Sequence, residues 1–94
     1  MPRKRSAQRA PELIKKAILA KEIARILDDQ GLTQTEASFI AREAPSQLSL
    51  ITTGKLRGFS AERLLRTLTR LGRDVEVRIR PAKSRSGKVR LVVR

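Results

Sequence analysis

Residues 31–58 read GLTQTEASFIAREAPSQLSLITTGKLRG, and this stretch decides the fold. Thr33 and Glu36 have the spacing of a capping box, in which each side chain bonds the other residue's free backbone N–H at the start of a helix. We therefore expect a short helix over about 34–41.

A second short helix is predicted directly after the first. Pro45 suits the first position of a helix and Gly54 suits the residue after its end, so this helix should cover about 45–53. Ala37 and Ala41 are small enough to let the two helices cross closely. Two short helices joined by roughly three residues are typical of a helix-turn-helix, whose second helix enters the major groove of DNA.

Apolar periodicity predicts further helices on both sides of this stretch. A helix over 11–30 begins with Pro11 and ends before Gly31, and Ser60 caps another over 61–71. The residues expected to face inward are Leu13, Ala17, Ala20, Ile23, Leu27, Leu48, Ile51, Leu64, Leu65, Leu68 and Leu71. The two aromatic residues, Phe39 and Phe59, are expected to help fill this mainly aliphatic core.

The apolar period changes from 3.6 to 2 after residue 72, which predicts a β-strand over 75–80. Residues 81–87 read as a loop, and 88–93 alternate again, so the C-terminus forms a strand or a hairpin. Whether 81–94 is ordered as a second strand stays open. The apolar face and open edges of the first strand favour it as a dimer or partner element, through Val75, Val77 and Ile79.

The chain therefore divides into three parts: a basic disordered arm over 1–10, a helix-turn-helix domain over 11–74, and the C-terminal strand or hairpin over 75–94. Its 94 residues allow one domain with a modest core. The longest apolar run, 17–20, is too short to span a membrane. We expect a soluble, cytoplasmic protein.

Composition argues against catalysis. The chain has no cysteine and no histidine, which excludes disulfides, Cys/His zinc sites and histidine acid–base chemistry. The carboxylates make no metal-spaced cluster and read as helix-surface and capping residues: Asp28, Asp29, Glu36, Glu43, Glu62, Asp74 and Glu76. We expect no enzyme activity, no cofactor and no metal ion. Arg63, Arg66 and Arg70 read as a solvated helix face.

Positive charge is concentrated on the two flanks. The net charge is +13, of which residues 1–10 carry +4 and residues 78–94 carry +7, while 11–77 hold 11 basic and 9 acidic residues. Basic flanks without acidic residues indicate phosphate neutralisation by a nucleic-acid-binding protein.

Several motifs agree in order and spacing with one known family. GLTQTEA at 31–37 is followed by Ser49, GKL at 54–56, GFS at 58–60, RLL at 63–65 and LGRDVEV at 71–77. Over about 12–80 the chain resembles the XRE-type helix-turn-helix proteins, and within them the HigA-type antitoxins and their solitary relatives. The resemblance implies a mainly α, Cro-repressor-like bundle of about four to five helices.

The resemblance also implies roles for individual residues. Gln34 occupies the family's phosphate-clamping position, and the outward front of the second helix reads bases through Ser46, Gln47 and Leu50. Residues expected to grip phosphate are Thr33, Gln34, Arg42, Thr53, Lys55 and Arg57.

Three features depart from the family's pattern. Arg42 occupies a turn position that is usually glycine, where a left-handed backbone costs about 1–2 kcal/mol. Either the turn differs from the family's, or Arg42 is strained for a purpose such as a phosphate contact. Ala44 cannot cap the second helix with its side chain, so roughly 1 kcal/mol of helix stabilisation is missing. The tail 81–94 is basic, which disfavours binding to a toxin that is itself basic.

The sequence thus predicts a sequence-specific DNA-binding repressor that acts as a homodimer on a palindromic operator in double-stranded DNA. The resemblance implies the antitoxin of a HigBA-type system that regulates its own operon, with a small mRNA-nuclease toxin as partner. The alternatives are a solitary regulator, a protein-interaction module, and a non-specific nucleic-acid binder. No membrane partner is expected.

Overall fold

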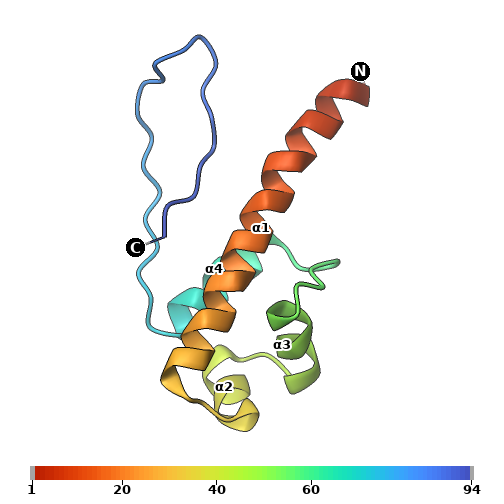
Figure 1. Cartoon of the computed structure of the whole chain (residues 1–94), viewed down its shortest axis with the longest axis vertical. Helices are drawn as coiled ribbons and strands as arrows, with labels where there is room; N and C mark the ends of the chain where they lie inside the picture. Colours follow the sequence, from red (N-terminus) through yellow and green to blue (C-terminus); the bar gives the residue numbers. More distant parts are fainter. Residues whose placement is uncertain (1, 94) are drawn as a thin grey trace.

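The computed structural model describes the backbone of residues 2–93 and the side chains of residues 16–93. Four helices make up the described fold: α1 (Pro2–Gln30), α2 (Gln34–Ala41), α3 (Pro45–Thr52) and α4 (Ala61–Arg70). The long α1 packs against α3 and α4, and α2 lies against the same two helices (Figure 1). The expected helical bundle is therefore confirmed, with α2, α3 and α4 close to their predicted bounds.

Helix α1 is longer than predicted. It begins at Pro2 and not near Pro11, so residues 2–10, expected to be a disordered arm, are helical. Proline suits the first turn of a helix, and the arginine, lysine, alanine and glutamine residues that follow are good helix formers. Pro11 lies inside the helix, where its missing N–H removes one backbone hydrogen bond. The side chains of 1–15, including the expected core residue Leu13, lie outside the described residues.

The core is aliphatic and contains a single aromatic residue. Phe59 is buried among leucine, isoleucine and alanine side chains, whereas Phe39 is 86% exposed, so its predicted core position was wrong. Ala37 and Ala41, four residues apart, set the buried face of α2. Phe39 lies two residues from each and points to the opposite side of the helix. The buried hydrophobic residues are Leu19, Ala20, Ile23, Ile26, Ala37, Ala41, Leu48, Ile51, Phe59, Leu64, Leu68 and Leu71.

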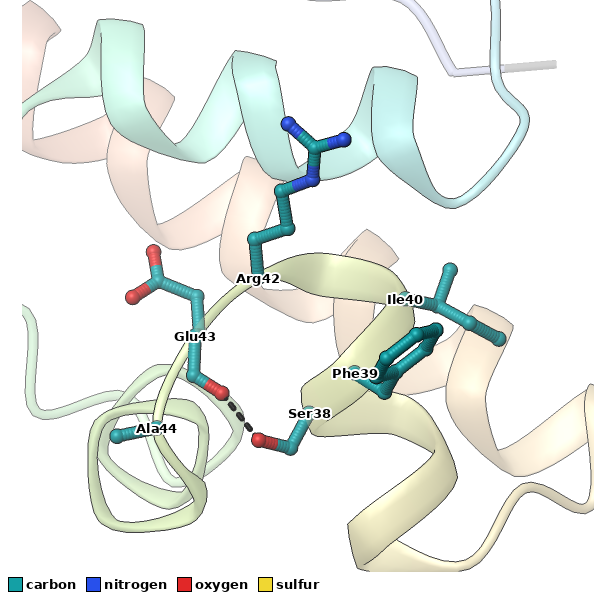
Figure 2. A pocket seen from close by; sticks show the side chains of 6 residues that line it. All are labelled: Ser38, Phe39, Ile40, Arg42, Glu43 and Ala44. Carbon is teal, nitrogen blue, oxygen red and sulfur yellow. Dashed lines mark hydrogen bonds between the residues drawn. The ribbon is translucent and has the colours of Figure 1, made fainter.

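Of the two alternatives left open for the turn between α2 and α3, the structure has the strained backbone. Arg42 has φ 56° and ψ 42°, a left-handed conformation, and its N–H donates to the Ser38 carbonyl. The Ser38 hydroxyl donates to the Glu43 carbonyl, which closes the turn on its outer side (Figure 2). Ala44 makes no side-chain cap, as expected, and Pro45 begins α3.

A buried ion pair ties this turn to α4. Glu43 is only 7% exposed, so the prediction that it is a surface residue was wrong. Arg63 donates from Nε and Nη2 to both Glu43 carboxylate oxygens, at 2.8 and 2.6 Å, and stacks 4.5 Å from the centre of the Phe59 ring. The hydrogen bond and the charge of Glu43 raise the pKa of Arg63. Arg70 adds a donor from α4 to the Ala41 carbonyl at 3.4 Å.

The predicted C-terminal strands are absent from the described residues. Residues 74–93, here called the C-terminal loop, run out from α4 and return toward the helices without strand structure (Figure 1). Their backbone makes no backbone–backbone hydrogen bond within the described chain. An isolated two-stranded ribbon is marginally stable in water, so the alternating pattern alone does not produce a ladder. Leu91 nevertheless packs against the core.

The Glu43–Arg63 pair should contribute measurably to stability. Arg63→Met keeps much of the stem that covers Phe59 but leaves the buried Glu43 carboxylate without its partner. Removing one partner of a fully buried pair costs roughly 3–5 kcal/mol; because the Arg63 side chain is 36% exposed, we expect about 1–3 kcal/mol. Urea denaturation followed by circular dichroism measures the change.

Arg66→Met is the matched control. It breaks an exposed pair on the same helix, whose Arg66 and Glu62 side chains are 51% and 81% exposed. Such a pair contributes less than about 1 kcal/mol. Equal losses in the two variants would show that the buried pair has no special role.

Candidate nucleic-acid interface

Helix α3 has one buried face and one exposed face. Leu48 and Ile51 are buried, whereas Ser46, Ser49 and Thr53 are exposed. Positions three and four residues apart lie on the same side of a helix, so these three hydroxyl side chains form one row. This exposed face of α3 is small, polar and free of charge.

The three predicted base-reading residues are placed differently from one another. Ser46 is exposed at the start of the helix, while Gln47 and Leu50 are half-buried at the flanks of the exposed row. Leu50 also packs against the core, so only part of its side chain is available to a ligand. The structure adds Ser49, three residues after Ser46, which the sequence-based set omitted. Leu48 and Ile51 were expected to face inward, and this pattern already implied that Ser49 faces outward.

The start of α2 carries the predicted capping box. The Glu36 N–H donates to the Thr33 hydroxyl oxygen at 3.1 Å, and the Thr33 N–H donates to the Glu36 carboxylate at 3.0 Å. Hydrogen bonds from the backbone N–H and the side chain of Thr33 to its carboxyl group lower the pKa of Glu36. The cap fixes the direction of α2, and Gln34 follows as its first residue with an exposed side chain. Gln34 can therefore donate to an anion in front of the helix.

The segment after α3 carries two exposed cations. Gly54, at φ 79°, ends the helix, and Lys55 and Arg57 follow it. Neither cation forms an ion pair with any residue that the structure describes. The Thr53 hydroxyl, also predicted to grip phosphate, donates to the Ser49 carbonyl at 2.7 Å. Its proton is thus used within the chain, and a phosphate would have to compete for it.

Arg42 does not join the other predicted phosphate residues. Figure 2 shows its side chain extending toward α4 and away from the α3 ribbon. The left-handed backbone directs it there, on the rim of a shallow hollow lined by Ser38, Phe39, Ile40, Arg42, Glu43 and Ala44. Gln34 begins α2, the exposed hydroxyl row lies on α3 and the two cations follow α3, whereas Arg42 extends from the turn toward α4.

Some exposed cations on the other helices are paired with carboxylates. Arg66 pairs with Glu62 on α4, and Arg25 on α1 pairs with Glu22 and with Asp29. Among the residues whose positions are described, no group of three or more carboxylates could hold a metal ion. No described helix has the length and apolar character needed to cross a membrane.

Residues 4–80 match the model of a helix-turn-helix domain family. A solved structure named "Putative XRE Family Transcriptional Regulator" is 32% identical, with a TM-score of 0.80; the match covers 89% of this chain and 94% of that one. The comparison with curated proteins found no match. The family match spans most of the chain and includes both short helices and the turn between them, so this protein belongs to the XRE-type helix-turn-helix family.

Proposed function

We propose that this protein is a sequence-specific DNA-binding transcriptional repressor and not an enzyme. The observation that carries the proposal is the exposed, uncharged polar face of α3, together with the exposed donor Gln34 at the start of α2 and two exposed cations after α3 that have no ion-pair partners among the described residues. The similar solved structure bears the name of a transcriptional regulator, which supports the same reading.

In this proposal α3 lies in the major groove of DNA. Gln47 offers the amide that pairs with adenine, the hydroxyls of Ser46 and Ser49 bond base edges, and the exposed part of Leu50 contacts a thymine methyl group. Gln34, Lys55 and Arg57 bind phosphates on either side and fix the register of the protein on the duplex. Glu43, which is buried and paired, takes no part in DNA contact.

Base reading is tested by selecting preferred sequences from a random duplex library and then measuring affinities of variants. Gln47→Ala should cost about 1–3 kcal/mol on the selected sequence and little on a scrambled duplex. Gln34→Ala and Lys55→Ala should weaken binding to both duplexes alike, because phosphate contacts carry no sequence information.

Thr69→Ala is the control, since Thr69 is an exposed polar residue on α4, which takes no part in the proposed DNA contact. It should leave both affinities unchanged. If Gln47→Ala weakened the two duplexes equally, α3 would not be the reading element.

We further propose that the protein binds DNA as a homodimer, joined through the alternating segment that holds Val75, Val77 and Ile79. Val77 and Ile79 are 83% and 95% exposed, and the backbone there has free hydrogen-bonding groups. An exposed apolar strand edge pairs readily with a second chain. A two-fold dimer would place two copies of α3 about 34–36 Å apart on a palindrome.

Sedimentation equilibrium tests the dimer. Val77→Lys combined with Ile79→Lys should convert the protein to a monomer, because the charges oppose burial of this face. The control Arg78→Lys with Arg80→Lys keeps the charge and the apolar row, and should stay dimeric. A monomeric wild-type protein at high concentration would refute the dimer.

Two biological settings fit a repressor of this kind. The motifs that resemble HigA-type antitoxins favour an antitoxin that represses its own operon and binds a small mRNA-nuclease toxin. The exposed basic C-terminal loop favours a solitary regulator, since like charges would repel a basic toxin. Copurification with the product of the adjacent gene distinguishes the two.

A further inference from the structure

The C-terminal loop contains the largest set of cations without ion-pair partners in the described chain. Arg78 is held by Glu76 at 3.1 Å. The other five cations of the loop are exposed and form no ion pair with a described residue: Arg80, Lys83, Arg85, Lys88 and Arg90. No acidic residue follows Glu76 in the sequence. A strong positive field therefore surrounds this loop.

The loop lies away from the DNA-reading face proposed above. Figure 1 shows α1 standing between the loop and α3. The tip of the loop and the N-terminal end of α1 extend toward the same end of the molecule, while α2 lies toward the other. The longest extent of the molecule is 47 Å. Since 2–10 also carries four basic residues and no acidic one, both basic flanks are directed to one end.

The chemistry of the loop fits a phosphate backbone. Arginine and lysine bind phosphates without reading sequence, and an extended chain can follow a strand of nucleic acid. In 77–80 and 88–91 basic residues alternate with apolar ones, so an extended backbone carries the two kinds on opposite sides. The basic side can therefore bind phosphate while the apolar side faces the core or a second chain, as the packing of Leu91 illustrates.

We propose that the C-terminal loop is a second, sequence-independent site for the DNA backbone, through which the protein holds a duplex segment other than the one read by α3. The loop binds the second duplex segment through its charge, whereas α3 recognises the first segment by its base sequence. The proposal rests on the proposed function for the first segment only.

The test uses the full chain and two variants that each lose four positive charges. The loop variant carries Lys83→Gln, Arg85→Gln, Lys88→Gln and Arg90→Gln. The control carries Lys16→Gln, Lys21→Gln, Arg66→Gln and Arg73→Gln, which lie on or next to α1 and α4. Beads hold a duplex with the selected sequence, the protein is added, and capture of a fluorescent scrambled duplex is measured.

Wild type and control should capture the second duplex, and the loop variant should capture at least about tenfold less while still binding the selected one. On scrambled duplex alone, the slope of log affinity against log salt should fall by up to about 3.6 for the loop variant, at about 0.9 for each lost phosphate contact. Failure of the wild type to capture a second duplex would overturn the proposal, as would equal losses in the two variants. If library selection yields no preferred sequence, base reading by α3 fails, and the salt slopes still test the loop separately.

Discussion

The bidentate ion pair between Glu43 and Arg63 is the contact on which the geometry of the candidate interface depends. It joins the turn before α3 to α4 across 20 residues of sequence, and both carboxylate oxygens accept from the same guanidinium group. Arg63 also covers Phe59, the one aromatic residue in the core. A planar guanidinium that is fixed on two sides holds the carboxylate in one orientation, which a lysine could not do. The direction in which α3 leaves the turn is therefore set from α4.

The turn itself carries a cost that these contacts offset. Arg42 adopts a left-handed conformation that disfavours any residue with a Cβ, and Ala44 provides no cap for α3. The Ser38 hydroxyl, the Arg70 guanidinium and the Glu43 pair together supply hydrogen bonds at this turn. A tight connection joins the end of α2 to the start of α3, so the turn fixes how the two helices are oriented. The strained backbone of Arg42 is therefore part of the turn that sets the orientation of α3, the helix proposed to contact DNA.

Local patterns in the sequence predicted most of the helical fold. The capping box, Pro45 and Gly54 predicted the bounds of α2 and α3, because caps and helix ends depend on neighbouring residues alone. The partners of Glu43 and the exposure of Phe39 could not be predicted from local patterns, because both depend on how distant helices pack. The C-terminal pattern predicted strands that the structure does not contain, since alternation describes a face and a strand also needs a partner. In the candidate site, Gln34 and Ser46 are exposed as expected, whereas Leu50 is partly used by the core.

Two parts of the molecule have different proposed tasks: α2 and α3 with the cations that follow them would recognise a sequence, and the C-terminal loop would neutralise phosphate. Mapping backbone amide shifts by nuclear magnetic resonance during titration with a duplex that carries the preferred sequence tests this most directly. At the first equivalent of DNA, the largest changes should occur at Gln34, at 46–50 and at Lys55, with smaller changes in 78–91. Changes confined to the C-terminal loop, with α3 unaffected, would contradict recognition by the helix-turn-helix.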